Sequence, residues 1–287
     1  MPLPEKRSSG VFILSHGRAN NVKTWTSLKK AGYSGRVWII LDNEDQEIEK
    51  YEKNFGSENV IVFDKKKIAT TFDEADTTGD RRSVVYARNA SWEIAKDLGL
   101  THFLQLDDDY VGFFYKYRRG GFYVNTKVRQ ADRLFNIFWN WLDSGDISCV
   151  AMSQEGDHIG GAKGNFRKHF LKRKAMNSLF LRVDRPFSFV GRVNEDVNTY
   201  VVYGTRGNIF FTTMAATINQ TQTQSSAGGM TDLYLQSGTY AKSFYTILMS
   251  PSSVKLHLMR PHGYRIHHRI SWKNTIPKII NDRYEKK

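Results

Sequence analysis

Cysteine is almost missing from the chain, and long apolar segments are missing altogether. Cys149 is the only cysteine among 287 residues, so no disulfide can form within the chain, which indicates a reducing compartment. No apolar run approaches the length of a membrane span. The first ten residues, MPLPEKRSSG, have no apolar core after their charges and do not resemble a secretory signal. We expect a soluble, cytoplasmic protein that does not enter a membrane.

Acidic residues are also in short supply. Asp and Glu together number 29 against 42 Lys and Arg, which gives a formal net charge of +13. Such a surplus is typical of proteins that bind a polyanion such as nucleic acid, although it can also serve solubility alone. The length permits one large domain or two closely joined ones, and no internal repeat is visible. We expect one domain over residues 1–287.

Short apolar runs alternate with helical patterns up to residue 106. The runs cover residues 11–15, 36–41, 60–63 and 102–106, and helix-like spacing covers residues 21–31, 45–55 and 84–98. This order predicts an α/β fold whose central sheet is mostly parallel, with helices on both faces. Ligands of such sheets bind beyond the carboxyl ends of the strands.

The pattern changes after residue 109. Residues 113–119 and 122–126 flank two glycines and predict a hairpin, so an antiparallel portion is expected beside the parallel strands. Further helices are expected at 129–142 and 231–249, further strands at 148–153 and 178–183, and loops at 156–174 and 221–229.

Three successive aspartates follow the apolar run that ends at residue 106. Like charges as close as those of Asp107, Asp108 and Asp109 either raise each other's pKa or bind a cation. Their hard oxygen atoms suit Mg²⁺ or Mn²⁺, which keep positions for water and for phosphate oxygens. Because side chains alternate along a strand, we expect Asp107 and Asp109 on one face. A solvated acidic turn is the alternative.

The ordered set of segments resembles the glycosyltransferases of the GT-A fold. Their aspartate-any-aspartate metal motif is matched by Asp107-Asp108-Asp109, and RRSVVYARNASWEIAKDLGLTHFLQLDDDY is similar to the family's Arg-Asn pair, helix, turn and metal strand. The segments SHGRANNVKTWTSL and VWIILDNED resemble the elements that hold the nucleotide base. The chain is closer still to the phage TET/JBP-associated glycosyltransferases, through GRVNEDVNTY and PSSVKLHLM as well. The resemblance implies a GT-A-like single domain, with a nucleotide-sugar-binding half (1–110) and an acceptor-binding half (111–287).

The resemblance also implies Mn²⁺ or Mg²⁺ as cofactor and a UDP-sugar as donor, with UDP-glucose expected. Asp107 and Asp109 would contact the metal, and Asp108 would face the ribose. A late histidine would complete the metal shell, with His257 as the candidate and His262, His267 and His268 as alternatives. Any of these histidines could instead be structural.

Four further residues are expected at the nucleotide sugar. Asp42 could accept hydrogen bonds from the base or ribose, or could simply form a turn. The guanidinium groups of Arg18 and Arg88 could bind the diphosphate or base, or could be ordinary structural arginines. Ser15 lies in the first of the nucleotide-holding segments.

The acceptor hydroxyl needs a base within hydrogen-bond reach. The resemblance points to an acidic pair before a helix, found here in Asn194-Glu195-Asp196. Asp196 is our candidate for the base and Glu195 its competitor. Acids in a first helical turn also complement the helix dipole, and the two roles can coexist.

Basic residues gather in two places. The first group is Arg167, Lys168, His169, Lys172, Arg173 and Lys174, and the second is Arg260, His262, Arg265, His267, His268 and Arg269. Such groups would bind a DNA backbone and position a duplex without reading its sequence.

We therefore expect an enzyme that transfers a sugar to 5-hydroxymethylcytosine in phage DNA. The alternatives are a glycosyltransferase with a glycan, lipid or protein acceptor, a DNA-binding protein without catalysis, and a metal-dependent nuclease or nucleotidyltransferase.

Overall fold

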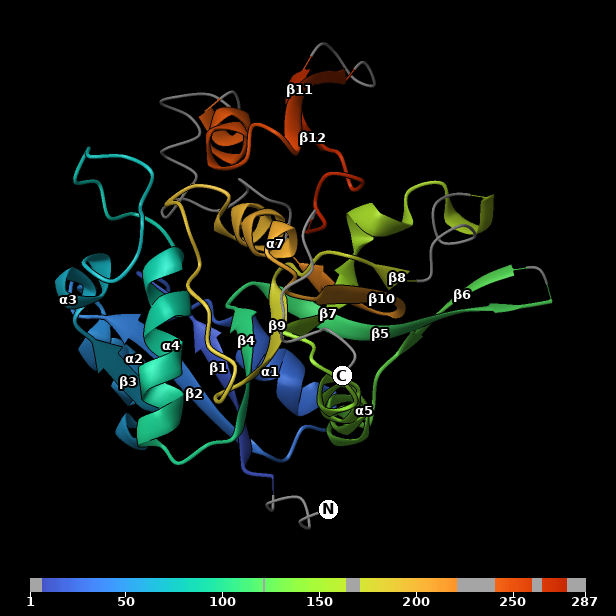
Figure 1. Ribbon diagram of the computed structural model, residues 1–287. Coiled ribbons are helices and arrows are strands. Elements are labelled where there is room, and N and C mark those ends of the chain that lie inside the picture. Colours follow the sequence, from blue (N-terminus) through green and yellow to red (C-terminus); the bar gives the residue numbers. More distant parts are fainter. Residues whose placement is uncertain (1–6, 121, 164–170, 221–240, 260–264, 278–287) are drawn as a thin grey trace, which may run out of the picture.

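A single large sheet runs through the protein. The computed structural model describes residues 7–120, 122–163, 171–220, 241–259 and 265–277. Within them, ten strands form one sheet in the order β3-β2-β1-β4-β9-β7-β10-β5-β6, with β8 beside β10, and β11 pairs with β12 in a separate sheet (Figure 1). The strands are β1 (Ser9–Leu14), β2 (Arg36–Asp42), β3 (Val60–Phe63), β4 (His102–Asp107), β5 (Tyr110–Arg119), β6 (Phe122–Lys127), β7 (Cys149–Gln154), β8 (Leu171–Lys172), β9 (Ser178–Arg182), β10 (Phe210–Gln220), β11 (Val254–Met259) and β12 (Arg265–Ile270).

The first part of the sheet is parallel, as the alternating pattern predicts. β1 pairs with β2 and β4, and β2 pairs with β3, all in parallel register. The helices whose bounds lie within the described residues are α1 (Lys23–Lys30), α2 (Ile48–Phe55), α3 (Lys65–Ala69), α4 (Val85–Asp97), α5 (Ala131–Asp143) and α7 (Glu195–Thr205), with 3-10 turns at Ser57–Asn59, Glu155–His158 and Gly161–Lys163.

Two apolar layers cover the two faces of this sheet. Alternate residues of β1 belong to different layers: Val11 and Ile13 pack in the layer that includes α1, α2 and α5, and Phe12 and Leu14 in the layer that includes α3, α4 and α7. The expected α/β fold with helices on both faces is confirmed.

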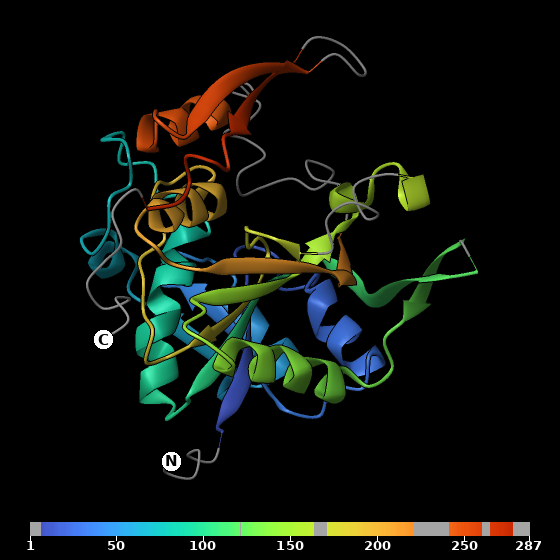
Figure 2. The same ribbon diagram turned by 45° about the vertical axis from the view of Figure 1, so that its right-hand side comes forward.

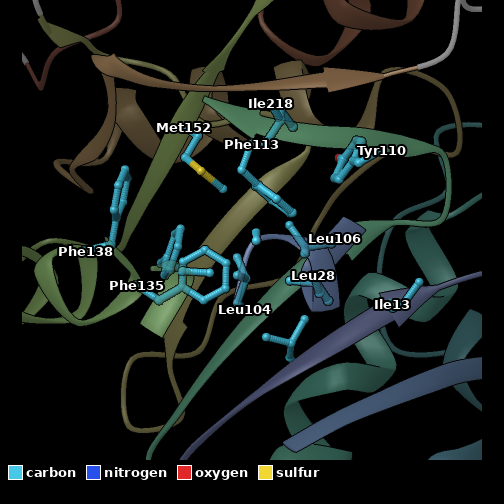
Figure 3. Packing of buried hydrophobic residues seen from close by; sticks show 14 of the residues in the cluster. Ile13, Leu28, Leu104, Leu106, Tyr110, Phe113, Phe135, Phe138, Met152 and Ile218 are labelled. Carbon is cyan, nitrogen blue, oxygen red and sulfur yellow. The ribbon is translucent and has the colours of Figure 1, made fainter. Parts of the chain in front are cut away.

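The first layer owes much to α5. Apolar residues recur every three or four positions in its sequence, ADRLFNIFWNWLD, and therefore share one face. The ring of Phe138 stacks on Phe180 of β9 with centroids 4.6 Å apart, and Phe135 meets Phe180 edge to face at 5.5 Å. Figure 3 shows both α5 rings facing the side chains of the sheet, including Leu104. Burying each ring stabilises the fold by roughly 1.5–3 kcal/mol.

The second part of the sheet is mixed. β9 runs antiparallel to both β4 and β7, whereas β7 and β10 are parallel. The β5–β6 hairpin joins the far edge through an antiparallel pairing of β5 with β10. The expected antiparallel portion is therefore confirmed.

Several elements differ from the expectation. The local patterns predict neither α3, β8 nor β10, and α7 is implied only by the resemblance. β10 is hard to recognise because FFTTMAATINQ is buried on both faces and shifts register between Thr213 and Thr217. Residues 241–249 are helical, while the rest of the predicted helix at 231–249 and the loop at 221–229 lie outside the described residues. No helix in the described part of the chain is long and apolar enough to span a membrane.

Candidate active site

Three neighbouring parallel strands end at one edge of the sheet. β1 is followed by Ser15, β2 ends at Asp42 and β4 ends at Asp107. Leu14 is paired with Asp107 in the β1–β4 ladder, so Ser15 lies beside the aspartates. The strand order thus brings predicted donor-site residues together at the edge where open α/β sheets bind ligands.

Asp107 is held in place by hydrogen bonds but is still accessible. Arg88 Nη2 donates a hydrogen bond to its Oδ1 over 3.0 Å, and the Tyr110 hydroxyl donates to its Oδ2 over 3.2 Å. The Thr24 hydroxyl of α1 donates to the backbone oxygen of Asp107 over 2.6 Å. The Asp107 side chain is 25% exposed, so it has a fixed position and an open face.

Asp108 is buried and belongs to another network. The Ser15 hydroxyl donates to Asp108 Oδ2 over 2.6 Å, and Arg18 Nη1 donates to Oδ1 over 3.0 Å. Burial raises the pKa of Asp108, against the opposing effects of Arg18 and Ser15. Both oxygens of the residue expected to face a ribose are thus engaged by the protein, where they tie the loop after β1 to the end of β4.

Asp109 lies where negative charge accumulates. Burial, followed by the charges of Asp107 and Asp108, raises the pKa of Asp109 to about 7, although Arg18 acts in the opposite direction. Asp108 and Asp109 form a turn between β4 and β5, so the strand-alternation argument for pairing Asp107 with Asp109 does not apply. Asp108 is more buried than its neighbours because its carboxylate is hydrogen-bonded to Ser15 and Arg18 of the loop after β1.

Arg88 links the aspartates to the acidic pair. Its side chain is 1% exposed, and Nε donates to Glu195 Oε1 over 3.0 Å while Nη2 donates to Asp107. The guanidinium also lies 5.8 Å from the ring centroid of Phe189. Its Nη1 has no hydrogen-bond partner among the described residues. The charged partners of Arg88 are therefore the protein's own carboxylates.

Glu195 and Asp196 occupy the first turn of α7. The preceding residue, Asn194, is in the left-handed conformation with φ 63°. Burial and then the charge of Asp196 raise the pKa of Glu195, whereas Arg88 lowers it. Asp196 Oδ1 accepts the N–H of Val197 over 2.7 Å, as a dipole-complementing acid would. Both proposed roles, helix capping and chemistry, are thus compatible with the geometry.

Asp42 is buried at the end of β2 in an ion cluster. His16 Nδ1 lies 2.8 Å from Asp42 Oδ2, and Lys65 Nζ lies 3.2 Å from Oδ1. Burial opposes ionisation of Asp42, but His16 and Lys65 outweigh it and lower its pKa. In turn the hydrogen bond to Asp42 raises the pKa of His16.

Tyr51 and Asp45 are parts of the site that sequence reasoning missed. The backbone N–H of Arg18 donates to the Tyr51 hydroxyl over 2.8 Å, and Ser15 Oγ lies 2.8 Å from the same hydroxyl. The N–H of Gly17, at φ 63°, donates to Asp45 over 2.7 Å. The acid after β2 was visible as part of VWIILDNED, but Tyr51 sits inside a helical pattern and carried no signal.

The late histidines that the structure describes form no metal-holding group with the aspartates. His257 is exposed on β11 and paired opposite His267 of β12. Among the described residues, no group of three or more His, Cys, Asp or Glu side chains is arranged to hold a metal ion. His268 Nδ1 lies 3.4 Å from Asn194 Nδ2, and burial lowers its pKa to about 4. His262 lies outside the described residues.

The predicted DNA-binding residues are placed only in part. Lys172 and Lys174 both form ion pairs with Asp157, over 2.8 and 2.5 Å. Arg173 Nη2 donates to the backbone oxygen of Trp272 over 2.6 Å, with its guanidinium 5.6 Å from that ring's centroid. His267 and Arg269 lie on β12, and Arg269 is exposed. The structure does not describe the side chains of the remaining predicted residues, which are Arg167, Lys168, His169, Arg260 and Arg265.

Open α/β sheets bind ligands beyond the carboxyl ends of their strands, and in this protein that edge carries an acidic cluster. Residues 9–229 match the family model of the TET-associated glycosyltransferases. The match spans more than half of the chain, so the protein belongs to this family and is a glycosyltransferase.

Similar solved structures share little sequence with the chain, and no curated protein matches it. A mycobacterial protein is similar with a TM-score of 0.47 at 9% identity, covering 93% of this chain and 85% of its own. Glucosyl-3-phosphoglycerate synthase from Mycobacterium tuberculosis is similar in its complex with Mn²⁺, uridine diphosphate and phosphoglyceric acid, with a TM-score of 0.45 at 9% identity over 93% and 88%. Its complex with Mg²⁺ and uridine diphosphate gives 0.47 at 9% identity over 93% and 89%.

Proposed function

We propose that the protein transfers a sugar, glucose in the simplest case, from a UDP-sugar to the hydroxyl of 5-hydroxymethylcytosine in phage DNA. The observation that carries the proposal is the acidic turn at the end of β4, where the pKa of Asp109 is raised to about 7, joined through buried Arg88 to the acidic pair of α7. In a glycosyltransferase this arrangement offers a place for a cation-bound diphosphate beside a base.

Asp107 and Asp109 are the residues that would hold Mg²⁺ or Mn²⁺. Their chemistry fits a hard cation, because both offer carboxylate oxygens and the neighbouring acids outweigh Arg18 in their effect on Asp109. A protein that supplies one or two carboxylates leaves the other positions for water and phosphate oxygens, which is the usual arrangement for Mg²⁺. When bound, the cation supplies Lewis-acid stabilisation of the departing diphosphate. His257 is not needed for this arrangement.

The donor nucleotide would lie against the loops after β1 and β2. Ser15 and Arg18 are fixed there through Asp108, and Asp42 through His16 and Lys65. We assign the nucleotide sugar to residues 1–110 and the acceptor to residues 111–287. Arg88 orients Asp107 and Glu195 from beneath this surface.

Asp196 is our candidate for the base that accepts the proton of the acceptor hydroxyl. Glu195 is engaged by Arg88, whereas Asp196 accepts the N–H of the next residue at Oδ1. Its Oδ2 is then the oxygen that a hydroxyl would approach. A base that accepts the hydroxyl proton as the sugar is transferred must lie within hydrogen-bond reach of that hydroxyl in the reactive complex.

The DNA acceptor is supported by charge and by family. A sugar nucleotide needs only a few cations, whereas the net charge of +13 suits a polyphosphate. The family name links these glycosyltransferases to TET enzymes, which is in keeping with a modified pyrimidine as acceptor. The single cysteine, Cys149, is buried and unpaired, in keeping with work in the reducing cytoplasm of a host cell.

The test is an acceptor and donor panel. The protein is incubated with Mn²⁺ or Mg²⁺, UDP-glucose or other nucleotide sugars, and DNA containing either 5-hydroxymethylcytosine or cytosine; digested nucleosides are then weighed by mass spectrometry. We expect one added hexose only on the hydroxymethylated base. Turnover on a glycan, lipid or protein acceptor, with none on DNA, would replace the DNA proposal by that acceptor class.

The choice of base is tested separately with Asp196→Asn and Glu195→Gln. We expect Asp196→Asn to slow single-turnover transfer the more strongly while leaving UDP binding intact. The reverse ranking would assign the proton to Glu195.

A further inference from the structure

The β5–β6 hairpin extends outside the body of the protein. β5 begins at Tyr110, directly after the acidic turn, and ends at Arg119, a length of roughly 30 Å for a strand of this many residues. β6 is an edge strand of the sheet. Figures 1 and 2 show the outer end of the hairpin projecting away from the rest of the protein. Its outer residues are exposed, including Tyr117 at 40% and Phe122 at 77%.

The charge of this hairpin is of one sign. The sequence from residue 110 to 127 contains Lys116, Arg118, Arg119 and Lys127 and no Asp or Glu. Cross-strand pairing places Lys127 opposite Phe114, and alternation along β5 then puts Lys127, Lys116 and Arg118 on one face. Arg119 lies on the other face, directly opposite Phe122. The hairpin therefore presents three exposed cations, Arg118, Arg119 and Lys127, and an apolar ring near its tip.

Further lysines lie near the base of the hairpin. Lys116 is buried at the base of the hairpin, with Glu155 among the charges that act on it. The charges of Lys116, Lys172 and Lys174 all act on His158, and burial together with these charges lowers the pKa of that histidine to about 4. Three lysines thus lie near His158 beside the hairpin, and Asp157, which pairs with Lys172 and Lys174, offsets part of their charge.

We propose that the β5–β6 hairpin is a DNA-binding arm that enters the major groove of the acceptor duplex. The proposal rests on the proposed DNA acceptor and goes beyond it by naming the element that holds the duplex. The major groove is about 12 Å wide and admits a two-stranded β-ribbon. A substituent at C5 of a pyrimidine projects into the same groove. Because the arm begins at Tyr110, next to the acidic turn, a duplex held on it has its modified face directed to the reaction site.

The chemistry of the arm divides the work between its residues. Arg118, Arg119 and Lys127 are exposed and would bind backbone phosphates, which contributes affinity without sequence preference. Phe122 would make apolar contact within the groove, where the base edges carry carbon substituents.

The test measures binding of the full-length protein to a fluorescein-labelled duplex containing 5-hydroxymethylcytosine, by fluorescence anisotropy over a series of salt concentrations. The arm variant carries Arg118→Ala, Arg119→Ala and Lys127→Ala. We expect it to bind about tenfold or more weakly at about 0.1 M salt. The slope of log K against log salt should fall by about 0.9 for each phosphate that the variant no longer neutralises.

A matched control removes the same charge near the other edge of the sheet. Lys53→Ala, Lys66→Ala and Lys96→Ala remove three exposed cations of α2, α3 and α4, around the β3 edge. We expect this variant to keep most of the affinity. Phe122→Ser keeps every charge of the arm, so we expect weaker binding with an unchanged salt slope.

Several results would overturn the arm. Equal decreases in affinity for the arm variant and the control variant would mean that only overall charge matters. Unchanged DNA binding by the arm variant would also refute the proposal. If the sedimentation coefficient of that variant differed from that of the wild type as well, the hairpin would be a contact between subunits, because cations on an edge strand can also govern strand-to-strand association.

The proposed function fails in a different way. If the wild-type protein binds the duplex through the hairpin but transfers no sugar to it, the proposal of a DNA-binding arm stands. The proposal that this DNA is the acceptor is then refuted. Calorimetric titration with UDP and Mn²⁺ monitors the donor side, and urea unfolding confirms that each variant is folded.

Discussion

Carboxylates near the two ends of β4 have pKa values shifted in opposite directions. At the amino end, Asp143 accepts hydrogen bonds from Arg7 over 2.6 Å and Arg182 over 2.5 Å, and lies 2.9 Å from His102. Burial opposes ionisation of Asp143, but these partners outweigh it and lower its pKa to about 2. Here one acid is surrounded by bases, and the arrangement stabilises the fold.

At the carboxyl end the balance is reversed. Five acids lie around the cations Arg18 and Arg88, and they are Asp107, Asp108, Asp109, Glu195 and Asp196. Burial and the neighbouring acids raise the pKa of Asp109 to about 7. This arrangement costs folding free energy at neutral pH and lies at the ligand edge of an α/β sheet, and both features support the proposed cation site.

The largest effect is expected from Asp109→Asn, which removes a carboxylate from the acidic end of β4 while keeping the shape of the side chain. We expect transfer activity to fall by about a thousandfold, equivalent to about 4 kcal/mol of transition-state stabilisation. Steady-state kinetics with varied Mn²⁺ measure it. Activity near that of the wild type would show that Asp109 takes no part in catalysis.

Arg88→Met tests the bridge at the acidic end. Removing one partner of a buried ion pair leaves uncompensated charge, so we expect a decrease of about 3–5 kcal/mol in the free energy of unfolding. Urea unfolding gives this value. If Arg88 positions Glu195, the double variant Arg88→Met, Glu195→Gln should recover part of the stability, and Arg88→Lys should restore stability better than kcat. Independent, additive effects would contradict the coupling.

Divalent cations should sharpen the contrast between the two ends. We expect Mn²⁺ at about a hundredfold excess over its Kd to stabilise the protein by about 2.7 kcal/mol, and Asp109→Asn to remove most of the effect. Thermal unfolding with and without Mn²⁺ measures it, and Asp143→Asn serves as a control that keeps the metal response. No change of Tm with Mn²⁺ or Mg²⁺ in the wild type would argue against a metal site.

The smallest effect is expected from Asp143→Asn at the amino end. Because the folded-state pKa of Asp143 is lowered, its contribution is present above its unfolded pKa near 4 and is lost as pH falls toward about 2. After a discount for partial exposure, we expect the variant to be less stable by roughly 1 kcal/mol at neutral pH, with the gap narrowing below about pH 4. Urea unfolding at several pH values, with Asp97→Asn as a control for removal of one exposed charge, tests this. A gap that does not change with pH would contradict it.

Local patterns were enough to predict most of the parallel half. The run at 60–63 coincides with β3, and the patterns at 84–98 and 129–142 match α4 and α5 to within a residue or two at each end. β10 could not be predicted because both of its faces are buried and its register shifts, which removes the alternation that marks a strand. The role of His257 stays a prediction: β11 pairs with β12, and among the described residues no group of three or more His, Cys, Asp or Glu side chains is arranged to hold a metal ion.

The candidate site also has parts that the sequence predicted and parts that it did not. The three aspartates and their place after a strand could be read from the chain, because the carboxyl ends of parallel strands meet at one edge. The contacts of Arg88 with Asp107 and Glu195 could not, because they join positions 19 and 107 residues apart.

By itself the sequence determined the alternation of elements, the acidic run and the excess of positive charge, since these depend on neighbouring residues and on composition. Only the tertiary structure decided which carboxylates are compensated, because a pKa depends on burial and on charges that reach a residue through space. The same folding put the β5–β6 hairpin outside the body, with its cations aligned on a surface that the order of residues alone does not define.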